Sequence, residues 1–248
     1  MSLCGVLHLS CSENIGCYYQ EWEVYTCSVT NLDNFDNNML ITNYSGIHES
    51  NRKDTNVNGI WITDTNTKYI PNNLGHLFNL SHFWMWRTQL IEIEEHNFKG
   101  MEKLQLLELY DNELSSLPSN SFNKLLNLRT LSLRNNQIEE LQNGLFTNNL
   151  NLDTIYLQFN KIKFIGSNLF NKLTRLNTVS LWDNVCINQD YTGSTKMMEL
   201  KDDIKINCLN PTEVIPTASE SLKVIDNYII DLLEEVDKSR QQQTTLKH

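Results

Sequence analysis

Residues 104–114 read LQLLELYDNEL, and residues 128–138 read LRTLSLRNNQI. The same spacing of Leu, Asn and Ile returns at residues 152–162, LDTIYLQFNKI. Rows of equal length therefore begin, without insertion, at Leu80, Leu104, Leu128, Leu152 and Leu176. Self-similarity at a fixed period of roughly 20–50 residues predicts a solenoid, in which each row buries its apolar face only against its neighbours.

Each column of the repeat has one chemical character. Positions 1, 4, 6, 11 and 14 are apolar, and alternate residues of the LxL segment at positions 4–6 point to one side of a strand. Position 9 is Thr88 in the row that begins at Leu80 and asparagine in the four rows that follow: Asn112, Asn136, Asn160 and Asn184. The side-chain amide of an asparagine at this position can form hydrogen bonds with the backbone of a sharp turn. Position 19 fills the space behind the turn with Phe98, Phe122, Phe146 and Phe170. A degenerate and slightly shorter row begins at Val57.

The pattern LxxLxLxxNxL resembles the signature of leucine-rich repeats and covers about residues 57 to 186. The resemblance implies an α/β solenoid, a leucine-rich repeat horseshoe with a parallel concave β-sheet, disulfide-stapled caps and a C-terminal helix. We expect an N-terminal cap over 11–56, repeats over 57–185, a cysteine cap over 186–210, and a linker, amphipathic helix and disordered tail over 211–248. Residues 1–10 are either a signal-peptide remnant or a first edge strand.

One row departs from its sisters at position 22. Asn149 stands there, whereas the other rows carry Met101, Leu125 and Leu173. We expect Leu150 to take over that core position and to distort the third row locally.

Composition excludes several classes of function. The chain of 248 residues has 30 Asp and Glu against 20 Lys and Arg, a net charge of −10, which disfavours nucleic acid as a partner. No run of apolar residues is long enough, at about 18 or more, to predict a membrane span. Motifs for catalysis, for a metal or for a cofactor are also absent from the sequence, so we expect neither an enzyme nor a cofactor.

The cysteines lie only near the two ends of the chain, at Cys4, Cys11, Cys17, Cys27, Cys186 and Cys208. Staples at both ends of an elongated core explain this placement and indicate an oxidising, extracellular compartment. The spacing of Cys186 and Cys208 resembles the C-terminal cap of extracellular leucine-rich repeat proteins, which implies a disulfide between them. At the other end, a hairpin over residues 17–27 would join Cys17 to Cys27, with Cys11–Cys27 as the rival pairing.

The segment from Leu117-Pro118 to Phe122, the cysteine-flanked cap and the tail together resemble arthropod leucine-rich repeat immune proteins of the secreted class. The resemblance implies an extracellular binding protein and suggests a part in innate immunity. It identifies no ligand. Two glycosylation sequons begin at Asn43 and Asn79.

The most informative surface is the concave face, where positions 3, 5 and 7 should point outward and position 8 should lie at the edge. Four of the five tryptophans fall on these positions, and exposed aromatic residues beside arginine mark binding surfaces. The alternative is that these rings only cover the sheet or pack beneath the N-terminal cap. The predicted ligand-binding residues are Trp61, Trp84, Trp86, Tyr110, Arg134, Tyr156, Gln158 and Trp182, with Glu108 beside them.

Six such strands would present only about 300–350 Å², which suits a peptide, a loop or a glycan better than a whole globular partner. The sequence therefore predicts a recognition module for a protein, peptide or microbial glycan. The alternative is a structural or assembly protein that forms a homo- or hetero-dimer through its caps and tail. In the tail, an a/d seam is formed by Leu222, Ile225, Ile229, Leu232 and Val236.

Overall fold

A computed structural model gives the fold and describes residues 4–14, 24–29, 40–47, 57–72, 74–77 and 79–209. The chain divides into two units, Met1–Leu209 and Asn210–His248. The repeats and both flanking caps belong to the first unit. The predicted tail helix with its a/d seam lies outside the described residues.

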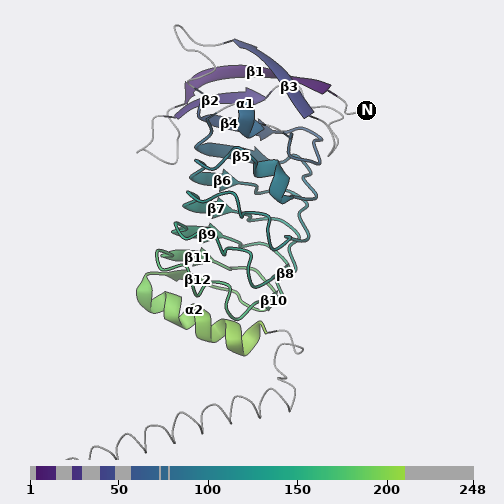
Figure 1. Cartoon of the computed structure of the whole chain (residues 1–248). Helices are drawn as coiled ribbons and strands as arrows, with labels where there is room; N and C mark the ends of the chain where they lie inside the picture. The colour runs from purple at the N-terminus through teal and green to yellow at the C-terminus, as the bar shows by residue number, and fades with distance from the viewer. Residues whose placement is uncertain are drawn as a thin grey trace, which may run out of the picture. The chain divides into compact units, whose positions relative to one another are not determined.

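The rows stack so that their strands form one sheet, as the leucine-rich repeat pattern predicts (Figure 1). The sheet keeps a constant parallel register, in which each repeat position faces the same position of the next row: Phe83 pairs with Leu107, and Leu107 with Leu131. The row strands are β4 (Gly59–Thr63), β5 (His82–Trp86), β6 (Leu106–Glu108), β7 (Thr130–Ser132), β9 (Thr154–Tyr156) and β11 (Thr178–Ser180).

Strands from the two caps extend this sheet from six strands to ten. On the N-terminal side the added strands are β1 (Cys4–Asn14), β2 (Val24–Val29) and β3 (Leu40–Ile47). Strand β2 pairs in parallel with β4 and antiparallel with β1, and β1 also pairs in parallel with β3. Residues 4–14 thus lie in a strand that is inside the sheet and not at its edge.

The N-terminal hairpin is wider than residues 17–27. Its paired strands are β1 and β2, with Asn14 opposite Val24, and the register places Cys11 directly opposite Cys27. Cys17 lies outside the described residues. The register is therefore compatible with the rival pairing Cys11–Cys27, and the pairing Cys17–Cys27 lies outside the described residues.

The hydrophobic core lies between the sheet face formed by positions 4 and 6 and a layer of short segments packed behind that face. The alternate strand residues at positions 4 and 6 are buried in every row, and the degenerate first row buries Val57, Ile60 and Ile62 in the same way. The phenylalanine column forms a continuous stack, with ring centres 6.0–6.1 Å apart. Behind the sheet lie α1 (Leu74–Leu77), the 3-10 helix η2 (Glu95–Phe98) and the parallel pair β8 (Glu140–Leu141) and β10 (Phe164–Ile165).

The asparagine column links each turn to the row before it, as expected. The Asn136 Oδ1 atom accepts a hydrogen bond from the backbone N–H of Leu114 at 3.0 Å, and its Nδ2 atom donates to the carbonyls of Leu109 at 2.9 Å and Leu133 at 3.0 Å. Asn160 repeats these contacts one row further along. In the first row Thr88 instead donates to the Oδ1 of Asn112.

The expected distortion at position 22 is wrong. Asn149 is itself fully buried in the core position, and Leu150 is 50% exposed. Backbone hydrogen bonds around Asn149 match those around Leu125 in the preceding row. The Asn149 side chain fits because its Nδ2 donates to the carbonyls of Phe122 and Leu125, at 2.9 Å each.

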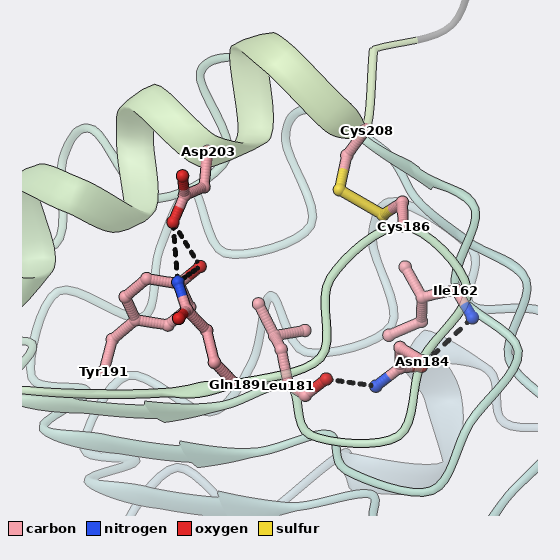
Figure 2. The surroundings of a disulfide bond; sticks show 8 residues. All are labelled: Ile162, Leu181, Asn184, Cys186, Gln189, Tyr191, Asp203 and Cys208. Carbon is pink, nitrogen blue, oxygen red and sulfur yellow. Dashed lines mark hydrogen bonds between the residues drawn. A yellow bond between two sulfur atoms is a disulfide. The ribbon is translucent and has the colours of Figure 1, made fainter.

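The C-terminal cap closes the last row with β12 (Asp190–Thr192), antiparallel to β11, and with α2 (Ser194–Asn207). The predicted disulfide joins Cys186 to Cys208 at the end of α2 (Figure 2). Helix α2 buries Leu200 and Ile204 in the hydrophobic core that the rows share.

A polar cluster beneath α2 fastens the helix to β12. The buried Tyr191 hydroxyl and the Gln189 amide both donate to one carboxylate oxygen of Asp203, each at 2.7 Å (Figure 2). Burial raises the pKa of Tyr191, so its hydroxyl keeps the proton that it donates. The cap is therefore held by a covalent bond and by a network of hydrogen bonds.

Candidate ligand-binding face

The outward positions of the strands align in two columns across the sheet. In the position 5 column, the register places Trp61 beside Trp84, Trp84 beside Glu108, and Glu108 beside Ser132, with Tyr156 next. Position 7 brings Thr63 beside Trp86 and continues through Tyr110, Arg134, Gln158 and Trp182. Strand pairing thus brings the predicted residues from six rows onto one face.

Stacked rings at position 7 and guanidinium groups at positions 7 and 8 form a ladder along the face. Trp86 and Tyr110 stack almost parallel, with ring centres 5.6 Å apart and an interplanar angle of 9°. The guanidinium of Arg134 lies over the Tyr110 ring at 4.4 Å, and that of Arg87 lies over Trp86 at 4.9 Å. We name these four residues, Arg87, Trp86, Tyr110 and Arg134, the cation–aromatic ladder. A guanidinium held on a ring is pre-oriented for carboxylate or other planar acceptor groups.

Trp84 and Trp86 are both only partly buried. Full burial of either ring beneath the N-terminal cap would have argued against a ligand-binding role for this face. Trp86 is held by the ladder, and Trp84 stacks on His82 with ring centres 5.4 Å apart. His82 is buried, which lowers its pKa to about 4, so it is neutral at pH 7. Trp61 is also partly buried. None of these rings is a fully buried core residue.

A carboxyl group lies beside the ladder on the neighbouring column. Burial raises the pKa of Glu108 to about 7, although the positive charge of Arg134 acts in the opposite direction. Burial also raises the pKa of Tyr110 and of Tyr156, and the negative charge of Glu108 adds to both shifts. Near neutral pH, the charge of the face therefore depends on whether Glu108 is protonated.

Ser132 departs from the expected openness of position 5. It is only 2% exposed, although its position in the repeat points outward. The exposure of the outward positions is therefore uneven, which the alternation of side chains along a strand does not predict.

A second aromatic group lies toward the C-terminal end of the face. The rings of Phe159 and Trp182 meet edge to face, with centres 4.8 Å apart, and are 42% and 47% exposed. Beside them, the side-chain oxygen of Gln158 is buried and accepts no hydrogen bond within the part of the chain that the structure describes.

Two residues of this face, Arg87 and Phe159, were not among the predicted ligand-binding residues. Both occupy position 8, where the other rows carry Asp64, Asp111, Asn135 and Asp183. The signal was present in the sequence, since a bulky residue replaces a short polar one in two rows of a regular column.

Of the sequon asparagines, Asn79 is exposed, and Asn43 lies in strand β3. Within the described residues no cluster of His, Cys, Asp or Glu could hold a metal ion. The helices of this described part include none long and apolar enough to cross a membrane.

The comparison with protein families identifies the repeats. The model of the BspA type leucine rich repeat region matches residues 68–195 with six copies, slightly more than half of the chain. The chain therefore belongs to this leucine-rich repeat family. No curated protein matches its sequence.

Solved structures share the fold. A chain of the TLR13–ssRNA13 complex matches with a TM-score of 0.50 and 23% identity, over 59% of this chain and 21% of that one. Two chains from Toll–Spatzle complexes of Drosophila match with TM-scores of 0.49 and 0.42 and identities of 23% and 16%. These two cover 52% and 58% of this chain and 18% and 27% of theirs. This chain thus spans less than a third of each matched chain, and at these identities the likeness shows the fold alone.

Proposed function

We propose that the chain is an extracellular recognition module that binds a protein or peptide ligand on its concave face. The cation–aromatic ladder is the observation that supports this most strongly, because it concentrates the residue types enriched at binding hot spots. The proposed contact residues are Trp61, Trp84, Trp86, Tyr110, Arg134, Tyr156, Gln158 and Trp182.

Core packing does not account for these rings. The hydrophobic core on the other face of the sheet is complete without them, and the rings of Trp86 and Tyr110 already stack on each other without a ligand. A pre-organised aromatic surface loses little conformational entropy on binding. A microbial glycan is the alternative ligand, since stacked rings also bind sugar faces, and a part in innate immunity would follow from such a ligand.

The extracellular part of the proposal is supported by the Cys186–Cys208 disulfide, because such bonds persist in oxidising compartments. The exposed Asn79 is then accessible as an acceptor for a glycan.

The test is an unbiased pull-down with the purified chain, comparing wild type with Trp86→Ala. Removing an aromatic anchor costs about 2 kcal/mol or more, roughly thirtyfold in affinity, so Trp86→Ala should lose the ligand. The control is Leu150→Ala, which truncates an exposed apolar residue outside the sheet and should retain the ligand. Equal recovery of the ligand with Trp86→Ala would contradict the proposal, provided that its melting temperature stays within a few degrees of wild type.

A second candidate function is assembly, which the heptad spacing of Leu222, Ile225, Ile229, Leu232 and Val236 favours. Two heptads are marginal for a lone coiled coil. Light scattering at increasing protein concentration distinguishes the candidates. A concentration-independent monomer that still binds its ligand favours recognition, whereas a dimer that Ile229→Asp dissociates favours assembly.

A further inference from the structure

The side chains at position 8 form a polar chain that is interrupted near the C-terminal end of the sheet. Arg87 pairs with Asp64 at 3.6 Å and with Asp111 at 4.0 Å, and the amide of Asn135 donates to Asp111 at 2.7 Å. Phe159 comes next and makes no polar contact of this kind. Beyond it, the exposed carboxylate of Asp183 has no cationic partner in the described part of the chain.

Phe159 is an unfavourable residue for its position. In all six rows the residue at position 8 adopts a left-handed backbone conformation, with φ between 52° and 58°, which asparagine and aspartate tolerate best and bulky side chains tolerate poorly. Phe159 is also 42% exposed, so burial of its ring offsets the strain only in part. An unfavourable conformation retained at an exposed aromatic residue indicates a functional contact.

The two aromatic groups of the face differ in one respect. At the N-terminal end the rings of Trp86 and Tyr110 are each covered by an arginine of this chain. No cation of the described chain covers the rings of Phe159 and Trp182. Asp183 follows Trp182 directly and is the next residue of the position 8 column after Phe159, so a carboxylate accompanies the two uncovered rings.

We infer that Phe159, Trp182 and Asp183 form a subsite for a basic side chain, an arginine or a lysine, of the protein ligand. The aromatic faces attract the cation, Asp183 neutralises its charge, and the aliphatic stem packs on the rings. The adjacent Gln158 adds a carbonyl oxygen that accepts no hydrogen bond within the described part of the chain and is available to an N–H of the ligand. This inference rests on the proposed function and names the chemistry that one end of the face recognises.

The probe is a short glycine–arginine peptide, acetyl-GRGRG-amide, titrated into the ¹⁵N-labelled full chain at physiological salt. Nuclear magnetic resonance follows the indole N–H of Trp182, identified by its loss in Trp182→Phe, and the backbone N–H of Asp183. The matched control replaces both arginines of the peptide with citrulline, which has nearly the same shape and no charge. We expect saturable shifts with arginine and none with citrulline, and equal shifts with both peptides would overturn the inference.

Two variants of the subsite and one outside it complete the test. Phe159→Asn and Asp183→Asn should each weaken binding of the arginine peptide about three- to tenfold. Phe159→Asn should keep or raise the melting temperature, since asparagine already occupies the same conformation at Asn135. Asp202→Asn removes one exposed charge from helix α2 and should change the affinity less than about twofold. Equal weakening by all three would show only a general attraction to an acidic protein and would overturn the subsite.

Failure of this inference is separable from failure of the proposed function. If Trp86→Ala loses the protein ligand while the arginine peptide does not bind, only the basic-residue subsite is wrong. If the peptide binds at Trp182 while Trp86→Ala retains the ligand, the ladder is not the centre of recognition.

Discussion

The guanidinium carbon of Arg134 lies 4.4 Å from the centre of the Tyr110 ring. The same positive charge acts on Glu108, whose pKa burial raises from 4.5 to about 7. The face therefore combines a fixed cation with a carboxyl group that changes charge near neutral pH. This combination makes both the stability of the chain and the charge of its face depend on pH.

We predict that Glu108 makes the folded chain less stable as pH rises. Between pH 4.5 and about 7, the unfolded chain releases the Glu108 proton while the folded chain keeps it, so the free energy of unfolding falls. The complete effect is about 3 kcal/mol above pH 7. In urea denaturation, Glu108→Gln should therefore be more stable than wild type at pH 8 and similar to it at pH 4.

Two further variants check the origin of this effect. Arg134→Gln should move the fall in stability to higher pH, because Arg134 lowers the pKa of Glu108. Glu113→Gln, which changes an exposed carboxylate, should leave the pH profile as in wild type. A profile that Glu108→Gln does not alter would contradict the prediction.

Asn136→Ala should lower the free energy of unfolding by about 1–3 kcal/mol, because it leaves buried backbone groups of two rows without partners. Its neighbour Gln137 is exposed, so Gln137→Ala should change stability by less than about 0.5 kcal/mol. Thermal melting of both variants compares them directly. Equal shifts would mean that the asparagine column does not carry the turns.

Removing the Cys186–Cys208 disulfide should cost about 3 kcal/mol, given the sequence separation of 22 between its cysteines. The double variant Cys186→Ala and Cys208→Ala avoids a free thiol, and chemical denaturation measures the loss. Mass spectrometry of the non-reduced wild type should find this bond intact. A free Cys186 thiol in that digest would contradict the prediction.

At the other end, we predict a disulfide between Cys11 and Cys27, because the strand register sets these two residues directly opposite each other. Peptide mapping of the same non-reduced digest should recover residues 11 and 27 in one linked pair. Recovery of Cys17 linked to Cys27 would instead support the narrower hairpin expected from the sequence.

The repeat period carries most of the fold because it fixes which side chains share a column. The strands, the buried positions, the Asn136 turn contacts and the phenylalanine stack all follow from columns that recur at the same place in every row. The outward columns at positions 5 and 7 are predictable for the same reason. Their identity as a ligand-binding surface stays a proposal.

The features that the sequence did not predict occur in single rows or in the caps, where no repeated column reveals them. Ser132 is only 2% exposed, although its outward position in the repeat predicts an exposed side chain. Phe159 matters because the backbone at position 8 is left-handed, which no apolar pattern records. The cap strands that extend the sheet belong to no repeat, so the pairing of β1 with β2 and β3 could not be read from a column.

Asn149 tests how the hydrophobic core accommodates a polar residue at a position that is apolar in the other rows. Its side chain is fully buried, its Nδ2 donates to two carbonyls, and its Oδ1 accepts no hydrogen bond within the described part of the chain. Both of those carbonyls, on Phe122 and Leu125, also accept backbone N–H groups, so neither depends on Asn149. The unpartnered Oδ1 therefore costs free energy that the two extra hydrogen bonds offset only in part.

Asn149→Leu, which restores the residue found at Leu125 and Leu173, should raise the free energy of unfolding by about 1–2 kcal/mol. Asn148→Leu is the matched control, because it makes the same replacement at the exposed neighbouring position and should change stability by less than about 0.5 kcal/mol. Urea denaturation of both variants against wild type measures the difference. A loss of stability in Asn149→Leu would show that the two donated hydrogen bonds outweigh the buried oxygen, and that this row depends on its asparagine.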